Sequence, residues 1–567
     1  MGLHYFDSVT DEKLDYEMYF GGDFDRNRPA TMYPHLTSLG ACQEKALEAI
    51  AFERLMSGST ANLDREARMI DMLVSMLADD GLLWITPDLR RKPWQKINEP
   101  FVMVHGQGRM MRAMIAWYQY TGDPAWRRRI DKMVEGIEKL VVHRDDYAYI
   151  PVHGFHDEEY LRSCYTHNGW KDTVEPTDEK FGEEGSLFNH QGHIPGALAT
   201  WSVLTGNERA LRLSGQLVRF YARPKFWADS KSGDYPFVNG ADHAHWQGHF
   251  HGHVNTLRAI LEYALATDDK RLMEFVRDGY EWSRQVGFAK IGYFDHQGCA
   301  TGRMIGLATK LSYHGIGDYW EDVDQYIRNH GSEMQFVPED KPFLYSLSEG
   351  KAPAKPSAQL VTDHVVDRVI GGFSGQADKT AFFLCCGPHG NMGLFYAWDA
   401  TLRYEEGVVR VNLLLNRASP WMDIDSHVPY EGKVVLRNKA AREAFVRIPV
   451  GVDRRSVHCS IGQAEIPKLW FGNYFRVVGL RPNDVVTLTF PLKETTGRWT
   501  IPGIPRVKGG TMETRVHTCR FKGNTLVELS PPLVDGSPLF QDRRRFLGGK
   551  APMVKVSRFE TPRVLRW

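Results

Sequence analysis

Two adjacent cysteines, Cys385 and Cys386, are the residues whose types and spacing most directly indicate chemistry. They stand in the segment LCCGPHGNMGLF, just before an expected helix. A thiolate pair at a helix start is well placed to bind a soft metal ion or to act as a nucleophile. A disulfide between neighbouring cysteines is strained, so we expect the pair to be reduced. The alternative is that these cysteines are simply buried small apolar residues.

Zinc takes four ligands, so the pair needs two more. Cys299 is the natural third ligand, because it lies at a pocket-facing position of the helical repeat described below. Asp295, His296 or Gln297 could supply the fourth. The chain holds seven cysteines, an odd and sparse set that argues against a disulfide scaffold.

A repeated pattern in the first 340 residues predicts the elements that position these groups. It consists of Ala, seven further residues, and then a short polar or glycine-containing turn at the end of an amphipathic run. The copies run over residues 49–59, 113–123, 197–207, 259–269 and, more weakly, 308–318. Repeated helix pairs stack to bury their apolar faces. We therefore expect an (α/α)6-type toroid, with a sixth copy around residues 63–90 or 372–404; an open solenoid would fit the same repeat.

Polar residues gather at one phase of this repeat, just before each Ala. In a toroid the corresponding loops converge on a central pocket, which is a better explanation for several such residues than isolated structural roles. The candidate substrate-binding residues at this phase are His105, Arg109, His190, His193, His251 and His253.

The helical pattern ends near residue 330 and short β-branched runs follow further along the chain, which predicts an α+β protein of several domains. Residues 1–404 are expected to form the toroid, including the helix that follows the cysteine pair. Short β-branched runs separated by turns predict a β-sandwich over residues 405–495. Residues 496–567 are expected to pack back on the body, with part of a second sandwich as an alternative.

Composition and charge exclude several classes of partner. The 567 residues include 70 basic and 70 acidic side chains, so no field of one sign is available to attract nucleic acid or an anionic membrane. No run of about 18 apolar residues is present to span a bilayer. The first residues lack the pattern of a secretory signal, so a cytoplasmic location is expected. A homodimer is left open.

In the order of its motifs the chain resembles the β-L-arabinofuranosidase family of glycoside hydrolases, family 127, as a divergent member. The resemblance covers roughly residues 100–495. Its matched pieces are Gly192-His193, the run 253–256, Cys299-Ala300, Cys385-Cys386, and the sandwich phrases at 432–434, 446–449 and 483–488.

The resemblance implies a zinc ion held by Cys299, Cys385 and Cys386, with Cys385 as the nucleophile. It also implies that His193 and His253 line the pocket. The family has a zinc-binding Glu where this chain has Gln297. The segment that carries the family's general acid/base Glu is missing, and Gly-Pro-His follows the cysteine pair in place of Pro-Pro-Asn.

The leading hypothesis is therefore a retaining glycosidase that uses zinc and acts on a glycan-derived sugar such as a β-L-arabinofuranoside. A carboxylic acid must protonate the leaving oxygen, and the candidates are Glu183, Glu184 and Asp295. One alternative is a sugar epimerase or lyase that uses the pocket histidines. Another is a carbohydrate-binding protein without catalysis.

Overall fold

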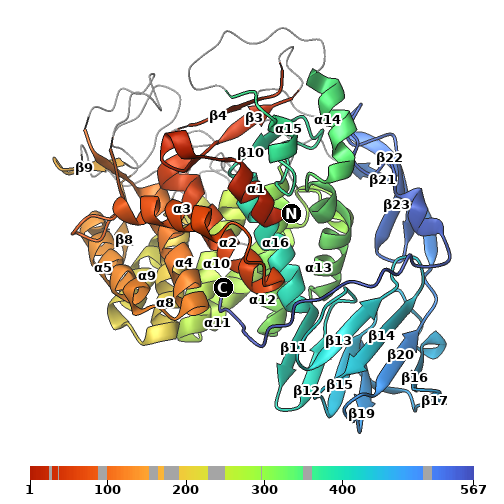
Figure 1. Cartoon of the computed structure of the whole chain (residues 1–567). Helices are drawn as coiled ribbons and strands as arrows, with labels where there is room; N and C mark the ends of the chain where they lie inside the picture. The colour runs from red at the N-terminus through yellow and green to blue at the C-terminus, as the bar shows by residue number, and fades with distance from the viewer. Residues whose placement is uncertain are drawn as a thin grey trace.

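The inner wall of the structure is a closed ring of helices (Figure 1). The computed structural model describes residues 1–24, 29–35, 38–86, 99–151, 164–170, 191–227, 250–294, 297–348, 361–501 and 514–567. Within these ranges the inner helices are α2 (Gln43–Ser57), α4 (Val104–Thr121), α8 (His193–Thr205), α10 (Phe250–Thr267), α12 (Gly298–Tyr313) and α16 (Cys386–Thr401). Each packs against the next, and α16 packs against α2. The expected (α/α)6-type toroid is confirmed, with α16 as its sixth inner helix.

An outer layer of amphipathic helices covers this ring. It contains α3 (Leu63–Ser75), α5 (Pro124–Leu140), α9 (Glu208–Tyr221), α11 (Lys270–Ser283) and α13 (Trp320–Tyr326). The turn motif of the repeat caps both helices that it joins. Gly122 ends α4 in the left-handed region at φ 73°, and Asp123 then accepts a hydrogen bond from Ala125 N–H at 2.8 Å to begin α5.

The remaining elements of this part of the chain are short helices and strands. They are α1 (Gly2–Ser8), α14 (Lys341–Ser348), α15 (Val365–Arg368), β1 (Thr10–Asp11), β2 (Glu17–Met18), β3 (Gly21–Asp23), β4 (Thr31–Tyr33), β5 (Trp84–Ile85), β6 (Phe101–Met103), β7 (Val142–His143), β8 (Ala148–Tyr149), β9 (Cys164–Thr166) and β10 (Ala381–Phe383). Strand order β10-β3-β4 ties the N-terminal segment to the residues just before α16.

A β-sandwich follows α16 without a linker. One sheet has the order β11 (Leu402–Glu405), β12 (Val408–Val411), β15 (Glu443–Arg447), β19 (Tyr474–Val478), β18 (Leu469–Phe471). The other has the order β13 (Met422–Ser426), β14 (Lys433–Asn438), β20 (Val485–Thr489), β16 (His458–Ile461), β17 (Ala464–Glu465). Alternate residues such as Val434, Leu436, Val486 and Leu488 face one core. The toroid, expected to extend to residue 404, ends with α16 at Thr401, and strand β11 begins at Leu402.

The C-terminal region packs back on the toroid. Strands β21 (Glu494–Ile501), β22 (Arg515–Lys522) and β23 (Thr525–Ser530) form a separate antiparallel sheet. Its Phe521 and Leu526 share an apolar cluster with Cys299 and Cys386. The tail then runs beside the sandwich to the toroid (Figure 1). There the ring of Trp567 stacks on that of Tyr396, with centroids 4.0 Å apart. Among the described helices, none is long and apolar enough to cross a membrane.

Candidate active site

Cys299, Cys385 and Cys386 lie together where α12 and α16 begin. The Sγ atoms of Cys385 and Cys386 are 3.6 Å apart. The Cys299 thiol donates to Gln297 Oε1 at 3.2 Å, and Cys386 Sγ lies 3.9 Å from the same oxygen. The four residues expected to bind zinc are therefore neighbours in the structure.

Two local features hold this cluster in place. Strand β10 pairs with β3, and the Leu384 N–H donates to the Phe20 carbonyl, which fixes the chain just before Cys385. Helices α12 and α16 also approach very closely at Gly302. A Cβ at this position would lie 2.2 Å from the His389 carbonyl oxygen, so no larger residue fits without displacing α16.

The donor set suits a soft metal ion. Zn–S bonds of about 2.3 Å place two thiolates of a tetrahedral site about 3.8 Å apart, close to the 3.6 Å between Cys385 and Cys386. His251 Nδ1 also lies 3.3 Å from Cys299 Sγ. Among the described residues, however, no group of three or more His, Cys, Asp or Glu side chains is already arranged to hold a metal ion. Zinc binding would therefore require these side chains to close around the ion.

The three sulfurs differ in their surroundings. Cys299 and Cys386 are fully buried, whereas Cys385 is half-buried. Burial raises the pKa of the Cys386 thiol well above its ordinary value, and the neighbouring Cys299 and Cys385 add to this effect. Cys385 occupies the N-cap of α16, where the helix dipole favours a thiolate. The Lys45 ammonium donates to its carbonyl oxygen at 3.2 Å, so a cation also lies beside this backbone.

A second cluster of arginine and histidine side chains lies in the interior of the toroid. His193 Nε2 is 3.3 Å from Arg109 Nε and 3.4 Å from a terminal nitrogen of Arg303. The same Arg303 nitrogen lies within hydrogen-bond distance of His389 Nε2. Burial, reinforced by Arg303, lowers the pKa of both His193 and His389 well below the ordinary value. Both imidazoles are therefore neutral near pH 7.

The two clusters meet at His251, whose ring centroid lies 5.6 Å from that of His389. The other predicted binding residues spread more widely. His253 packs edge-on against Trp227 with centroids 5.6 Å apart, and His105 is buried in the first turn of α4. His190 and the candidate acids Glu183, Glu184 and Asp295 lie outside the described residues.

Sequence reasoning missed several charged residues of this region. Arg303 and His389 each stand four residues, about one helical turn, after a predicted zinc ligand, and this spacing is the signal that could have found them. Glu44, in the first turn of α2, is fully buried and accepts the Gly40 N–H at 2.6 Å. Burial raises the pKa of Glu44 to about 7, although Arg109 and Lys45 oppose the change.

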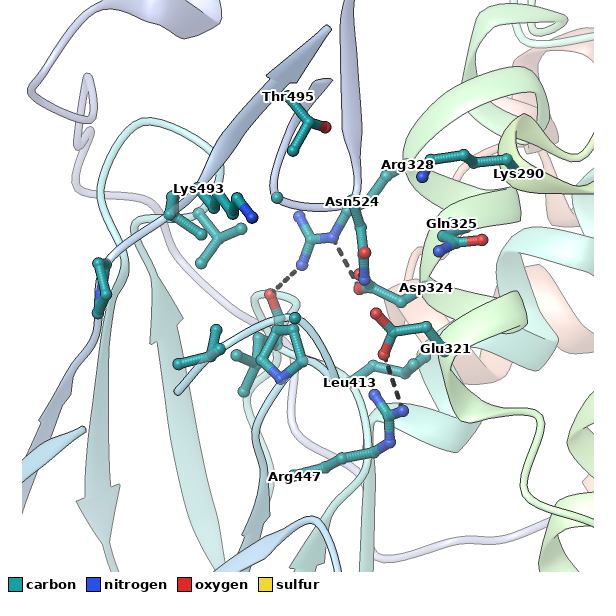
Figure 2. A pocket seen from close by; sticks show the side chains of 18 of the residues that line it. Lys290, Glu321, Asp324, Gln325, Arg328, Leu413, Arg447, Lys493, Thr495 and Asn524 are labelled. Carbon is teal, nitrogen blue, oxygen red and sulfur yellow. Dashed lines mark hydrogen bonds and ion pairs between the residues drawn. The ribbon is translucent and has the colours of Figure 1, made fainter. Parts of the chain in front are cut away.

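A separate cavity of about 270 Å³ lies between the toroid and the sandwich (Figure 2). Four of its charged side chains form two ion pairs. Arg447 pairs with Glu321 at 2.8 Å, and Arg328 pairs with Asp324 at 2.7 Å. Arg328 also donates to the Leu414 carbonyl at 2.6 Å. We interpret this cavity as part of the contact between the two domains.

Comparisons with known proteins establish the fold. No model of a protein family matches the chain, and no curated protein matches it. Among solved structures, the GH127 β-L-arabinofuranosidase of Geobacillus stearothermophilus T6 is similar with 15% identity and a TM-score of 0.51, over 85% of this chain and 75% of that one. A GH127 β-arabinofuranosidase aligns with 12% identity and a TM-score of 0.52, over 93% of this chain and 78% of that one. A further glycoside hydrolase aligns with 12% identity and a TM-score of 0.53, over 91% of this chain and 84% of that one.

Proposed function

We propose that this protein is a retaining glycoside hydrolase in which Cys385 is the nucleophile. The observation that carries the proposal is the thiol cluster at the start of α16, in which Cys385 is half-buried while Cys299 and Cys386 are fully buried. An accessible thiol at a helix N-terminus is the arrangement that favours nucleophilic attack. The toroid shared with solved glycoside hydrolases supports the same reaction class.

The reaction proceeds in two displacements. The Cys385 thiolate attacks the anomeric carbon of the sugar and forms a C–S bond, while the glycosidic C–O bond breaks and the leaving oxygen takes a proton from a carboxylic acid. Water then attacks the same carbon, gives its proton to the resulting carboxylate, and breaks the C–S bond. This sequence returns the thiolate and releases a reducing sugar.

Cys299, Cys385, Cys386 and Gln297 are the residues proposed to hold zinc, which when bound would favour the thiolate form of its cysteine ligands. Glu184 and Asp295 are the acids proposed from the sequence. A β-L-arabinofuranoside is the first substrate to test, since two of the similar structures are enzymes named for it or for arabinofuranosides.

The proposal is tested with a panel of 4-nitrophenyl glycosides and with N-bromoacetyl glycosylamines, which alkylate a nucleophile held beside the sugar. We expect one adduct per chain, at Cys385, and a loss of turnover of about 10³-fold or more in Cys385→Ala. The matched control is Cys459→Ala, which removes a buried thiol in the sandwich core and should keep full turnover. Folding of both variants is checked by circular dichroism.

Turnover by a folded Cys385→Ala variant at the wild-type rate would rule out the thiol as nucleophile. Product analysis separates the other hypotheses: an epimerase changes one stereocentre without releasing a sugar, and a lyase gives an unsaturated product. Metal content is measured on the same preparations. About one zinc per chain, lost in Cys299→Ser, is expected; a metal-free protein with full activity would contradict the zinc assignment.

A further inference from the structure

Arg303 is a buried cation without a carboxylate partner. Its side chain extends from α12 into the interior of the toroid, and the residue is 3% exposed. Its hydrogen-bond partners are the Nε2 atoms of His193 and His389. In the described part of the chain no carboxylate oxygen lies within ion-pair distance of this guanidinium. Such a charge is costly to bury unless an anion completes the site.

Three other buried arginines of the toroid each pair with a carboxylate. Arg112 pairs with Glu262 at 3.0 Å, and Arg54 pairs with Glu66 at 2.8 Å. Arg258 pairs with Glu262 as well, also at 3.0 Å. The fold thus compensates the buried guanidinium groups that serve packing, and Arg303 is the contrasting case.

The two imidazoles beside Arg303 accept its hydrogen bonds through Nε2. Each neutral ring therefore carries its proton on Nδ1, which points away from Arg303. The two rings are stacked with centroids 6.3 Å apart. Arg303 Nε is buried and has no hydrogen-bond partner within the described residues. An uncompensated guanidinium with a buried unpartnered donor is a site for an oxyanion.

This site lies next to the thiol cluster. Arg303 follows Cys299 by four residues on α12, and His389 follows Cys385 by four residues on α16. Residues four apart occupy the same face of a helix, about one turn or 5.4 Å further along. Arg303 and His389 therefore each lie about one helical turn from a cysteine of the thiol cluster.

We propose that the sugar bound in this toroid carries a carboxylate, as in a uronic acid, and that Arg303, which His193 and His389 hold in place, binds it. The proposal rests on the proposed glycosidase function and names its substrate class. A carboxylate carries the single negative charge that one uncompensated guanidinium requires, whereas a phosphate ester carries about −1.5 to −2 near pH 7. The proposed substrate, a charged sugar, differs from the neutral arabinofuranoside that the similar structures suggest.

Binding is measured by titration calorimetry with D-glucuronate and D-galacturonate, with D-glucose and D-galactose as neutral counterparts, and with D-glucose 6-phosphate. We expect the wild-type protein to bind at least one uronate about 10-fold or more tightly than its neutral counterpart. Arg303→Met should abolish this preference, and Arg303→Lys should retain part of it. Equal binding of acid and neutral sugar by the wild type, or an unchanged preference in Arg303→Met, would overturn the proposal. Tighter binding of the phosphate ester would overturn the choice of a carboxylate.

Thermal unfolding gives a readout that a structural role would not reproduce. Without ligand, Arg303→Met should unfold at or above the wild-type temperature, because it removes an uncompensated buried charge. The matched control Arg54→Met removes a buried arginine that has a carboxylate partner, and should unfold at a lower temperature while keeping uronate binding. A destabilised Arg303→Met would show instead that Arg303 serves packing.

These experiments are independent of turnover. Uronate binding that depends on Arg303, combined with full activity of Cys385→Ala, would refute the thiol mechanism and leave the anion site standing. Labelling of Cys385 by a neutral glycosylamine, with no preference for uronates, would support the glycosidase and refute the anion site.

Discussion

Glu44 should make the stability of the toroid depend on pH in a direction opposite to that of an ordinary paired carboxylate. Burial raises the pKa of Glu44 from about 4.5 to about 7 in the folded protein. Between these values the folded state binds more protons than the unfolded state, so stability falls as pH rises. A difference of about 2.5 between the folded and unfolded pKa corresponds to about 3 kcal/mol of unfolding free energy, at about 1.4 kcal/mol for each pKa unit.

The perturbation is Glu44→Gln, which keeps an oxygen to accept the Gly40 N–H but cannot ionise. We expect the variant and the wild type to have similar free energies of unfolding at about pH 4. At about pH 8 the variant should be more stable by about 3 kcal/mol, because the wild type must ionise a buried carboxyl group. Urea unfolding at intervals across this range measures the difference.

The charged groups acting on Glu44 are Arg109 on α4 and Lys45 on α2, and both are kept in the variant. The control is Glu135→Gln on α5, whose side chain is 57% exposed. Its curve should follow that of the wild type. A Glu44→Gln difference that stays constant between about pH 4 and pH 8, or a variant less stable at the upper end, would refute the reasoning.

Three further predictions concern the packing around the site. Glu262→Ala should cost about 3–5 kcal/mol of unfolding free energy, because it removes the carboxylate that pairs with both buried Arg112 and buried Arg258; urea unfolding measures this loss, and a cost below 1 kcal/mol would contradict it. Trp567→Ala should cost about 3–5 kcal/mol, since it removes the ring stacked on Tyr396; an unchanged melting temperature would show that the tail contributes nothing. Gly302→Ala should cost about 1–3 kcal/mol by pushing α12 from α16, and should slow alkylation of Cys385; labelling at the wild-type rate would separate the helix contact from the site.

The toroid could be predicted from the sequence because its signal is local and repeated. In two copies the glycine that stops one helix is directly followed by the Asp or Asn that begins the next, at Gly122-Asp123 and Gly206-Asn207. The end of α16 was not predictable in the same way. Leu402 begins strand β11 because that segment pairs with β12, which is a contact outside the helical pattern.

The thiol cluster was predicted from the order of its motifs, and its members are neighbours in the structure. Arg303 and Glu44 were not predicted, because a single charged residue in an amphipathic run normally faces solvent. Only the packing of the inner helices shows that these two are buried. Their roles come from the charges that surround them, which no short motif encodes.

The spacing of four residues places the arginine–histidine cluster next to the thiol cluster. On α12 and on α16 a cysteine is followed one turn later by a cationic or imidazole side chain, and Gly302 allows the two helices to approach closely at this level. An uncompensated guanidinium near the proposed nucleophile would select among sugars before any bond breaks, because a neutral ring leaves the buried charge unpaired. The same arrangement explains why the site can be tested by binding alone.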